Sequence, residues 1–181
     1  MPFFATFSKK SFLQAVFSLF RCYIYIGNAT NQQDIRFMND QKNPDRLKGL
    51  TLLSANERRY PQSPEDAKLE TFENMYPEND YVITFDCPEY TSLCPVTGQP
   101  DFGHIIIRYI ADKRCVESKS LKLYLFSFRN TNTFHEESVN RILKDFVEAC
   151  HPRKAEVVGL FRPRGGIAIN VKATFGGKID E

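Results

Sequence analysis

The chain has 181 residues, of which 42% are hydrophobic and 25% charged, a composition typical of a folded globular domain rather than of a disordered, collagen-like or membrane protein. Its 24 Lys and Arg against 22 Asp and Glu give a formal net charge of +2, too close to neutral for a broad nucleic-acid-binding surface, so no direct nucleic-acid partner is expected. Its five cysteines are an odd number scattered along the chain, which favours free thiols and predicts a cytoplasmic location.

Residues 1–37 differ in composition from the rest of the chain. They contain seven of the sixteen phenylalanines and four basic residues, but a single acidic residue. The apolar stretch 12–20 is interrupted by Gln14 and Ser18 and is shorter than the roughly 20 apolar residues that a membrane-spanning helix needs. No membrane anchor is therefore expected, and we interpret residues 1–37 as a leader or extension of doubtful function.

Residues 38–80 contain four prolines and little hydrophobic periodicity, which predicts an irregular arm with one short helical turn near residues 65–73. The ordered domain is then expected over residues 81–181. Its first two strands are predicted at residues 81–85 and 104–110, which are rich in β-branched and aromatic side chains.

Two helices and two further strands follow. Apolar side chains on more than one side of residues 117–129 predict a helix with a second packing partner, such as another subunit. Apolar residues then recur at helical spacing from Val139 to Cys150, and Thr133 followed three residues later by Glu136 fits a capping box at the start of that helix.

Strands are predicted at residues 154–161 and 166–171, joined by a turn rich in Pro and Gly. The resulting order, ββααββ, predicts an α+β domain in which an antiparallel sheet carries the helices on one face.

Residues 86–103 form an expected connector of eighteen residues between the first two strands, long enough to be functional or disordered. It carries Cys94 and Asp101. A thiolate is the nucleophilic form of cysteine and a nearby carboxyl group can donate or accept a proton, so the pair has the groups needed for covalent catalysis. The alternative is that Cys94 is a buried small side chain and Asp101 a turn or cap residue.

Other candidate sites have simpler alternatives. A zinc site is the main alternative for the cysteines, but the chain has no Cys-x-x-Cys or His-x-x-x-His pairing, so no metal site is expected. It has no Gly-x-Gly-x-x-Gly or Walker loop either, so a dinucleotide would not bind in a Rossmann crevice. Glu136 could serve only as a helix cap, and Lys119, Lys122 and Arg164 could simply be solvated.

Four sequence blocks occur along the chain: SLCPVTGQPDF at 92–102, ESKSLKLY at 117–124, FHE at 134–136 and PRGG at 163–166. Together they resemble the NADPH-dependent 7-cyano-7-deazaguanine reductase family of queuosine biosynthesis, in its short single-module form. The resemblance implies the tunnelling fold, in which a four-stranded antiparallel sheet carries two helices on one face. It also implies a homo-oligomer with its sites at subunit interfaces.

The same resemblance implies the reduction of the nitrile of 7-cyano-7-deazaguanine to 7-aminomethyl-7-deazaguanine, with NADPH as cofactor. In that reaction Cys94 attacks the nitrile carbon to form a covalent thioimide, and Asp101 supplies a proton. The residues implied to bind the substrate are Val116, Glu117, Ser118, His135 and Glu136. The residues implied to bind the NADPH phosphates are Lys119, Lys122 and Arg164.

Two other functions remain open at this point. One is a pterin or purine enzyme of the GTP-cyclohydrolase type, which would need a Cys and His zinc site. The other is a purine-binding module without catalysis, which would keep Glu117 and Glu136 but would not reduce its ligand.

Overall fold

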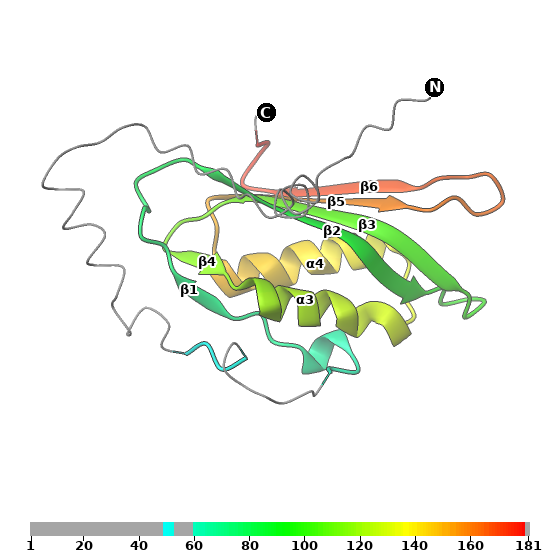
Figure 1. Ribbon diagram of the computed structural model, residues 1–181. Helices are drawn as coiled ribbons and strands as arrows, with labels where there is room; N and C mark the ends of the chain where they lie inside the picture. The colour runs from blue at the N-terminus through cyan, green and yellow to red at the C-terminus, as the bar shows by residue number, and fades with distance from the viewer. Residues whose placement is uncertain (1–48, 53–59, 180–181) are drawn as a thin grey trace, which may run out of the picture. The chain divides into compact units, whose positions relative to one another are not determined.

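The computed structural model describes residues 49–52 and 60–179, so the expected leader at residues 1–37 lies outside the described part (Figure 1). The elements in chain order are η3 (Pro64–Asp66), β1 (Thr71–Glu73), β2 (Val82–Leu93), β3 (Pro100–Ile110), β4 (Arg114–Val116), α3 (Ser118–Ser127), η4 (Phe128–Asn130), α4 (His135–Cys150), β5 (Lys154–Phe161) and β6 (Asn170–Phe175).

The main sheet has four antiparallel strands in the order β2-β3-β5-β6, and α3 and α4 cover one of its faces (Figure 1). The predicted α+β class and the ββααββ order are therefore confirmed. A second, two-stranded sheet of β1 and β4 was not predicted. Each of these strands has three residues, too few to produce a recognisable alternation in the sequence.

The core lies between the main sheet and the two helices. Side chains of β3 alternate between the two faces, so Ile105, Ile107 and Tyr109 are fully buried toward the helices. The ring of Tyr109 meets that of Phe146 from α4 edge to face, with centroids 4.9 Å apart. This packing holds α4 on the face of the sheet toward which Asp101 also points, because Asp101 precedes Ile105 on β3 by four residues.

The long connector predicted at residues 86–103 is wrong. The strands β2 and β3 extend through most of it and pair as far as Leu93 and Pro100, which leaves only residues 94–99 as a loop. Two of the prolines that indicated a loop are tolerated inside strands. Pro88 lies where the register shifts between Cys87 and Tyr90 on an edge strand, and Pro100 is the first residue of β3.

Two other elements differ from the prediction. The helical turn expected near residues 65–73 is η3, which ends at Asp66, and the following β1 belongs to the small sheet. The last strand begins at Asn170 rather than at residue 166, because Gly165 and Gly166, with φ of 56° and 81°, form a turn first.

Within the described residues, no helix is both long and apolar enough to cross a membrane.

Candidate active site

The loop at residues 94–99 joins β2 to β3 and carries Cys94. The Cys94 N–H donates to the Gln99 carbonyl at 2.9 Å, and the Gly98 N–H donates to the Cys94 carbonyl at 2.9 Å. Gly98 has φ of 66°, a left-handed conformation that side chains disfavour, so the loop requires glycine there. The backbone itself therefore fixes the position of Cys94.

The environment of Cys94 favours its thiolate. The Thr97 hydroxyl makes the largest contribution by hydrogen bonding, followed by the N–H groups of Thr97 and Val96, and Arg164 contributes less. These contacts outweigh a small effect of burial and lower the pKa of Cys94 to about 7. Because Cys94 is also partly exposed, its nucleophilic form is accessible near neutral pH.

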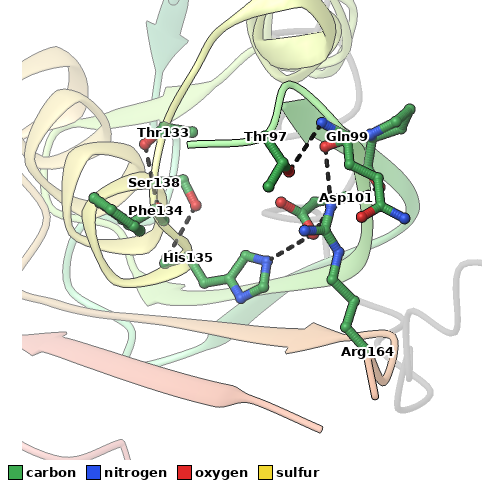
Figure 2. A network of polar contacts seen from close by, with 9 residues as sticks. Thr97, Gln99, Asp101, Thr133, Phe134, His135, Ser138 and Arg164 are labelled. Carbon is green, nitrogen blue, oxygen red and sulfur yellow. Dashed lines mark hydrogen bonds and ion pairs between the residues drawn. The ribbon is translucent and has the colours of Figure 1, made fainter. Parts of the chain in front are cut away.

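Asp101 lies beside this loop, near the start of β3, and only 5% of it is exposed. Its Oδ1 atom is 2.8 Å from Nη2 of Arg164 and 3.2 Å from Nε2 of His135, although the contact with His135 lacks hydrogen-bond geometry (Figure 2). The buried carboxyl group therefore lies between side chains from the β5–β6 connection and from α4. Such a group can exchange a proton with a bound ligand.

His135 is the first residue of α4, and another aromatic ring packs against one face of its imidazole. It stacks on the ring of Phe161, with centroids 3.9 Å apart and planes 13° apart, and the Ser138 hydroxyl donates to its carbonyl at 2.9 Å. The sequence did not indicate a site role for Phe161, which is the last apolar residue of a strand. The sequence likewise indicated no separate role for Thr97, although a hydroxyl three residues after a candidate nucleophile was an available signal.

Backbone hydrogen bonds connect the segment before α4 to Leu93, the residue that precedes the loop at residues 94–99. The Leu93 N–H donates to the Thr131 carbonyl at 3.0 Å, and the Thr133 N–H donates to the Leu93 carbonyl at 3.0 Å. These bonds hold two segments far apart in sequence, 92–102 and 134–136, close to each other (Figure 2).

The capping box predicted from Thr133 and Glu136 is wrong. Phe134 is the N-cap of α4, and its N–H donates to Glu137 Oε2 at 3.2 Å, so the capping carboxylate is one residue later than expected. Glu136 is exposed in the first turn, next to His135. The simplest alternative to a ligand-binding role for Glu136 is therefore removed.

Glu117 has a structural role of its own at the start of α3. Its carboxylate accepts hydrogen bonds of 2.7 Å from the N–H groups of Lys119 and Ser120, and only 4% of the residue is exposed. Val116 is also buried, as the last residue of β4. A carboxylate has about four acceptor positions, so the cap leaves some of them for a ligand.

The predicted site residues fall into two groups. The helix α3 has ten residues, so its two ends lie about 15 Å apart. Its C-terminal end leads through η4 to Thr131, whose carbonyl accepts a hydrogen bond from Leu93 at the end of β2 (Figure 1). The group at the loop end consists of Cys94, Asp101, His135, Glu136 and Arg164. The group on β4 and the first turns of α3 consists of Val116, Glu117, Ser118, Lys119 and Lys122.

Two cavities flank α3. One of about 490 Å³ is lined by Lys119 and Lys68, and one of about 580 Å³ is lined by Ser118, Lys122 and the bulged part of β2 around Cys87. Each cavity thus has a lysine from α3 at its wall. Across the described residues, no three His, Cys, Asp or Glu side chains are grouped as metal ligands would be.

Comparisons with known proteins agree on one family. A family model described as "QueF-like protein" matches residues 100–178. The solved apo structure of an archaeosine synthase QueF-Like has a TM-score of 0.52 and 21% identity, covering 56% of this chain and 99% of that one, and supports the tunnelling fold.

The chain is also similar to proteins named NADPH-dependent 7-cyano-7-deazaguanine reductase. That of Streptococcus thermophilus is 54% identical over 132 residues, 73% of this chain and 81% of the relative. That of Neisseria meningitidis is 54% identical over 135 residues, 75% of this chain and 86% of the relative. The chain therefore belongs to the NADPH-dependent 7-cyano-7-deazaguanine reductase family.

Proposed function

We propose that this chain reduces the nitrile of 7-cyano-7-deazaguanine to 7-aminomethyl-7-deazaguanine with NADPH, the activity for which its relatives are named. The observation that carries the proposal is the arrangement around Cys94. A partly exposed cysteine with a pKa of about 7 lies at the same end of the domain as a buried carboxyl group, Asp101, and an imidazole, His135.

The first step uses the nucleophile and the acid. The Cys94 thiolate adds to the nitrile carbon, so a C–S bond forms and one π electron pair of the nitrile moves to nitrogen. Asp101 donates a proton to that nitrogen, and the product is a neutral thioimide. Nε2 of His135 lies 3.2 Å from the Asp101 carboxyl group, close enough for the two side chains to interact electrostatically when the imidazole is protonated.

The remaining steps convert the thioimide carbon to a primary amine. NADPH, when bound, supplies the hydrides for this reduction. Cys94 must also leave, and a thiol with a lowered pKa is a better leaving group than an ordinary one. The same contacts from Thr97 and Val96 that make Cys94 a nucleophile therefore also assist its release.

Recognition of the substrate ring is assigned to the carboxylates. The guanine-like ring has adjacent N–H donors, and Glu136 and Glu117 can each accept more than one of them. In one subunit, however, Glu136 lies with Cys94 while Glu117 lies about one length of α3 away. The full set of ligands for one substrate would then come from two subunits.

We therefore propose a homo-oligomer in which the start of α3 in one subunit adjoins the Cys94 loop of its neighbour. Two features of the described residues support this arrangement. Strands β2 and β6 are the edges of the main sheet, and pairing between subunits would cover them. Phe126 of α3 is 38% exposed, in line with the second packing partner predicted for this helix.

The residues implied to hold NADPH fit a ligand with phosphate groups. Lys119 and Lys122 are three residues apart, so they lie on neighbouring positions of α3 and each lines a cavity. Arg164 is a guanidinium at the Cys94 end. Ammonium and guanidinium groups are the usual protein donors for phosphate, and Lys119, Lys122 and Arg164 would supply them to NADPH across the subunit boundary.

The chemistry also indicates the compartment. The reaction needs Cys94 as a free thiol, and Cys94 forms no disulfide with any described residue. We propose that the protein works in the reducing environment of the cytoplasm, where thiols stay reduced.

The test measures NADPH oxidation on adding 7-cyano-7-deazaguanine to freshly reduced protein, with the amine product quantified in parallel. Two NADPH consumed per amine support the proposal. Tight binding of the nitrile without NADPH oxidation would favour the alternative of a purine-binding module without catalysis. Cys94→Ala should lose both turnover and the thioimide absorbance, whereas Cys150→Ala, which removes a thiol at the opposite end of α4 from His135, should keep both. Residual reduction by Cys94→Ala would rule out Cys94 as the nucleophile.

A further inference from the structure

Arg164 is held at the tip of the connection between β5 and β6. Its backbone N–H donates to the Ile167 carbonyl, and its carbonyl accepts a hydrogen bond from the Ile167 N–H, both at 3.0 Å. Gly165 and Gly166 between them have positive φ, as a tight two-residue hairpin turn requires. The base of the Arg164 side chain is therefore fixed by the hairpin.

The guanidinium of Arg164 reaches across to the end of the cysteine loop (Figure 2). Its Nη2 donates to the Gln99 carbonyl at 2.9 Å and to the Pro100 carbonyl at 3.0 Å, and it lies 2.8 Å from Oδ1 of Asp101. The same Gln99 carbonyl accepts the bond from the Cys94 N–H that closes the loop. One nitrogen thus contacts three consecutive residues, two of them through the backbone.

We propose that Arg164 is a positioning residue for the covalent step: its guanidinium holds the Cys94–Gln99 loop against Asp101, so that the thiol and the carboxyl group face the same nitrile before NADPH is bound. The inference rests on the proposed function and goes beyond the phosphate-binding role implied for Arg164. A guanidinium suits this task because its donors are planar and rigidly arranged, whereas a lysine offers a single flexible point charge.

Electrostatics supports the same assignment. Arg164 is among the groups that lower the pKa of Cys94, after the Thr97 hydroxyl and the N–H groups of Thr97 and Val96. The other charged or titratable side chains at this end of the domain include Asp101, the first-turn residues His135, Glu136 and Glu137 of α4, and Arg162. Loss of Arg164 therefore changes both the loop geometry and the charge near the thiol.

The experiment separates this role from cofactor binding by omitting NADPH. Wild type, Arg164→Ala and Arg164→Lys are mixed with 7-cyano-7-deazaguanine alone, and thioimide formation is followed by stopped-flow absorbance. We expect formation to slow by about tenfold or more in Arg164→Ala, with only partial recovery in Arg164→Lys. The matched control is Arg162→Ala, which removes an exposed guanidinium placed over the Phe102 ring and should leave the rate unchanged.

A second readout needs no substrate. The rate of Cys94 alkylation by iodoacetamide is measured against pH by peptide mass spectrometry, and its midpoint, expected near pH 7 in wild type, should rise in Arg164→Ala. Circular dichroism checks the fold, and Arg164→Gln, which keeps a long polar side chain, repeats both assays if the alanine variant is unfolded.

The outcomes distinguish a positioning role of Arg164 from a role in NADPH binding alone. An unchanged thioimide rate and alkylation midpoint in Arg164→Ala, with only a higher KM for NADPH, would overturn the positioning role and leave the proposed function intact. If wild type forms no thioimide, the proposed function fails, and the alkylation midpoint alone decides whether Arg164 organises the cysteine loop.

Discussion

The imidazole of His135 lies flat on the phenyl ring of Phe161, with centroids 3.9 Å apart and planes 13° apart. Phe161 is itself 4% exposed, and its ring also meets that of Tyr90 at 6.1 Å. Gly103 leaves the space for it, because a Cβ there would come within 2.9 Å of the Phe161 ring. A buried aromatic residue outside the four sequence blocks therefore sets the plane of a candidate catalytic imidazole.

Replacing Phe161 with Leu should lower both turnover and stability. The smaller side chain no longer supports the imidazole, and misplacement of a group near the reaction centre can cost one or two orders of magnitude in rate. We expect kcat to fall about tenfold or more, and the free energy of unfolding to fall by about 1–3 kcal/mol. Steady-state kinetics and urea unfolding measure the two effects. Phe175→Leu, at a position 42% exposed, is the control, and equal kcat values would argue against this role.

Removing the Thr97 hydroxyl should make Cys94 less reactive at neutral pH. The hydroxyl makes the largest contribution to lowering the pKa of Cys94 to about 7, so Thr97→Val should raise the pKa toward the ordinary value of about 8.5. The thiolate forms as pH rises through the pKa, so alkylation and thioimide formation should both shift to higher pH. Thr97→Ser keeps the hydroxyl and should retain the wild-type profile. A midpoint that does not move in Thr97→Val would show that the hydroxyl is not the main cause.

Neighbouring glutamates at the start of α4 should have separable effects. Glu137 accepts a hydrogen bond from the Phe134 N–H, so Glu137→Ala should lower the free energy of unfolding by about 1 kcal/mol while leaving substrate binding near normal. Glu136 is exposed and does not cap the helix, so Glu136→Ala should leave stability unchanged and weaken substrate binding. Urea unfolding and calorimetric titration with the nitrile measure both. The assignment fails if the two variants bind the nitrile equally well.

Glu70 should contribute to stability at neutral pH but not in acid. Burial raises the pKa of Glu70, but hydrogen bonds from the Thr51 hydroxyl and from the N–H groups of Leu52 and Thr51 outweigh it, so the pKa is lowered. A lowered pKa stabilises the fold above the unfolded value of about 4.3, and the contribution is lost as pH falls through the folded value.

The matching variant is Glu70→Gln, which removes the charge and keeps the shape. We expect it to lower the free energy of unfolding by about 1–2 kcal/mol at pH near 7 and by much less at pH near 3. Urea unfolding at both pH values measures the difference. Glu148→Gln removes an exposed carboxylate and is the control. A loss of equal size at both pH values would mean that the charge of Glu70 does not account for its contribution.

The sequence by itself determined the features that depend on local pattern. The bounds of β5 agree with the predicted strand at residues 154–161, and the apolar spacing from Val139 to Cys150 predicted most of α4. Both signals arise from which side chains face the core, a property that repeats along a single segment. The four blocks likewise indicated the family that the comparisons then showed.

The tertiary structure decided what depends on contacts between distant segments. Pro88 and Pro100 predicted a loop, yet Pro88 lies at the bulge in β2 and Pro100 is the first residue of β3. The loop between the two strands is therefore only Cys94–Gln99. The small sheet of β1 and β4 was missed because its strands are stabilised by each other and not by a pattern of their own.

The candidate site follows the same division. The sequence named Cys94, Asp101 and Arg164, and their roles remain predictions, but only the folded chain places the Arg164 guanidinium on the Gln99 carbonyl and beside Asp101. Only the fold also separates Glu117 from Glu136 by a helix length. The physical reason is that such distances depend on strand register and helix packing, which are set by the whole core rather than by neighbours in sequence.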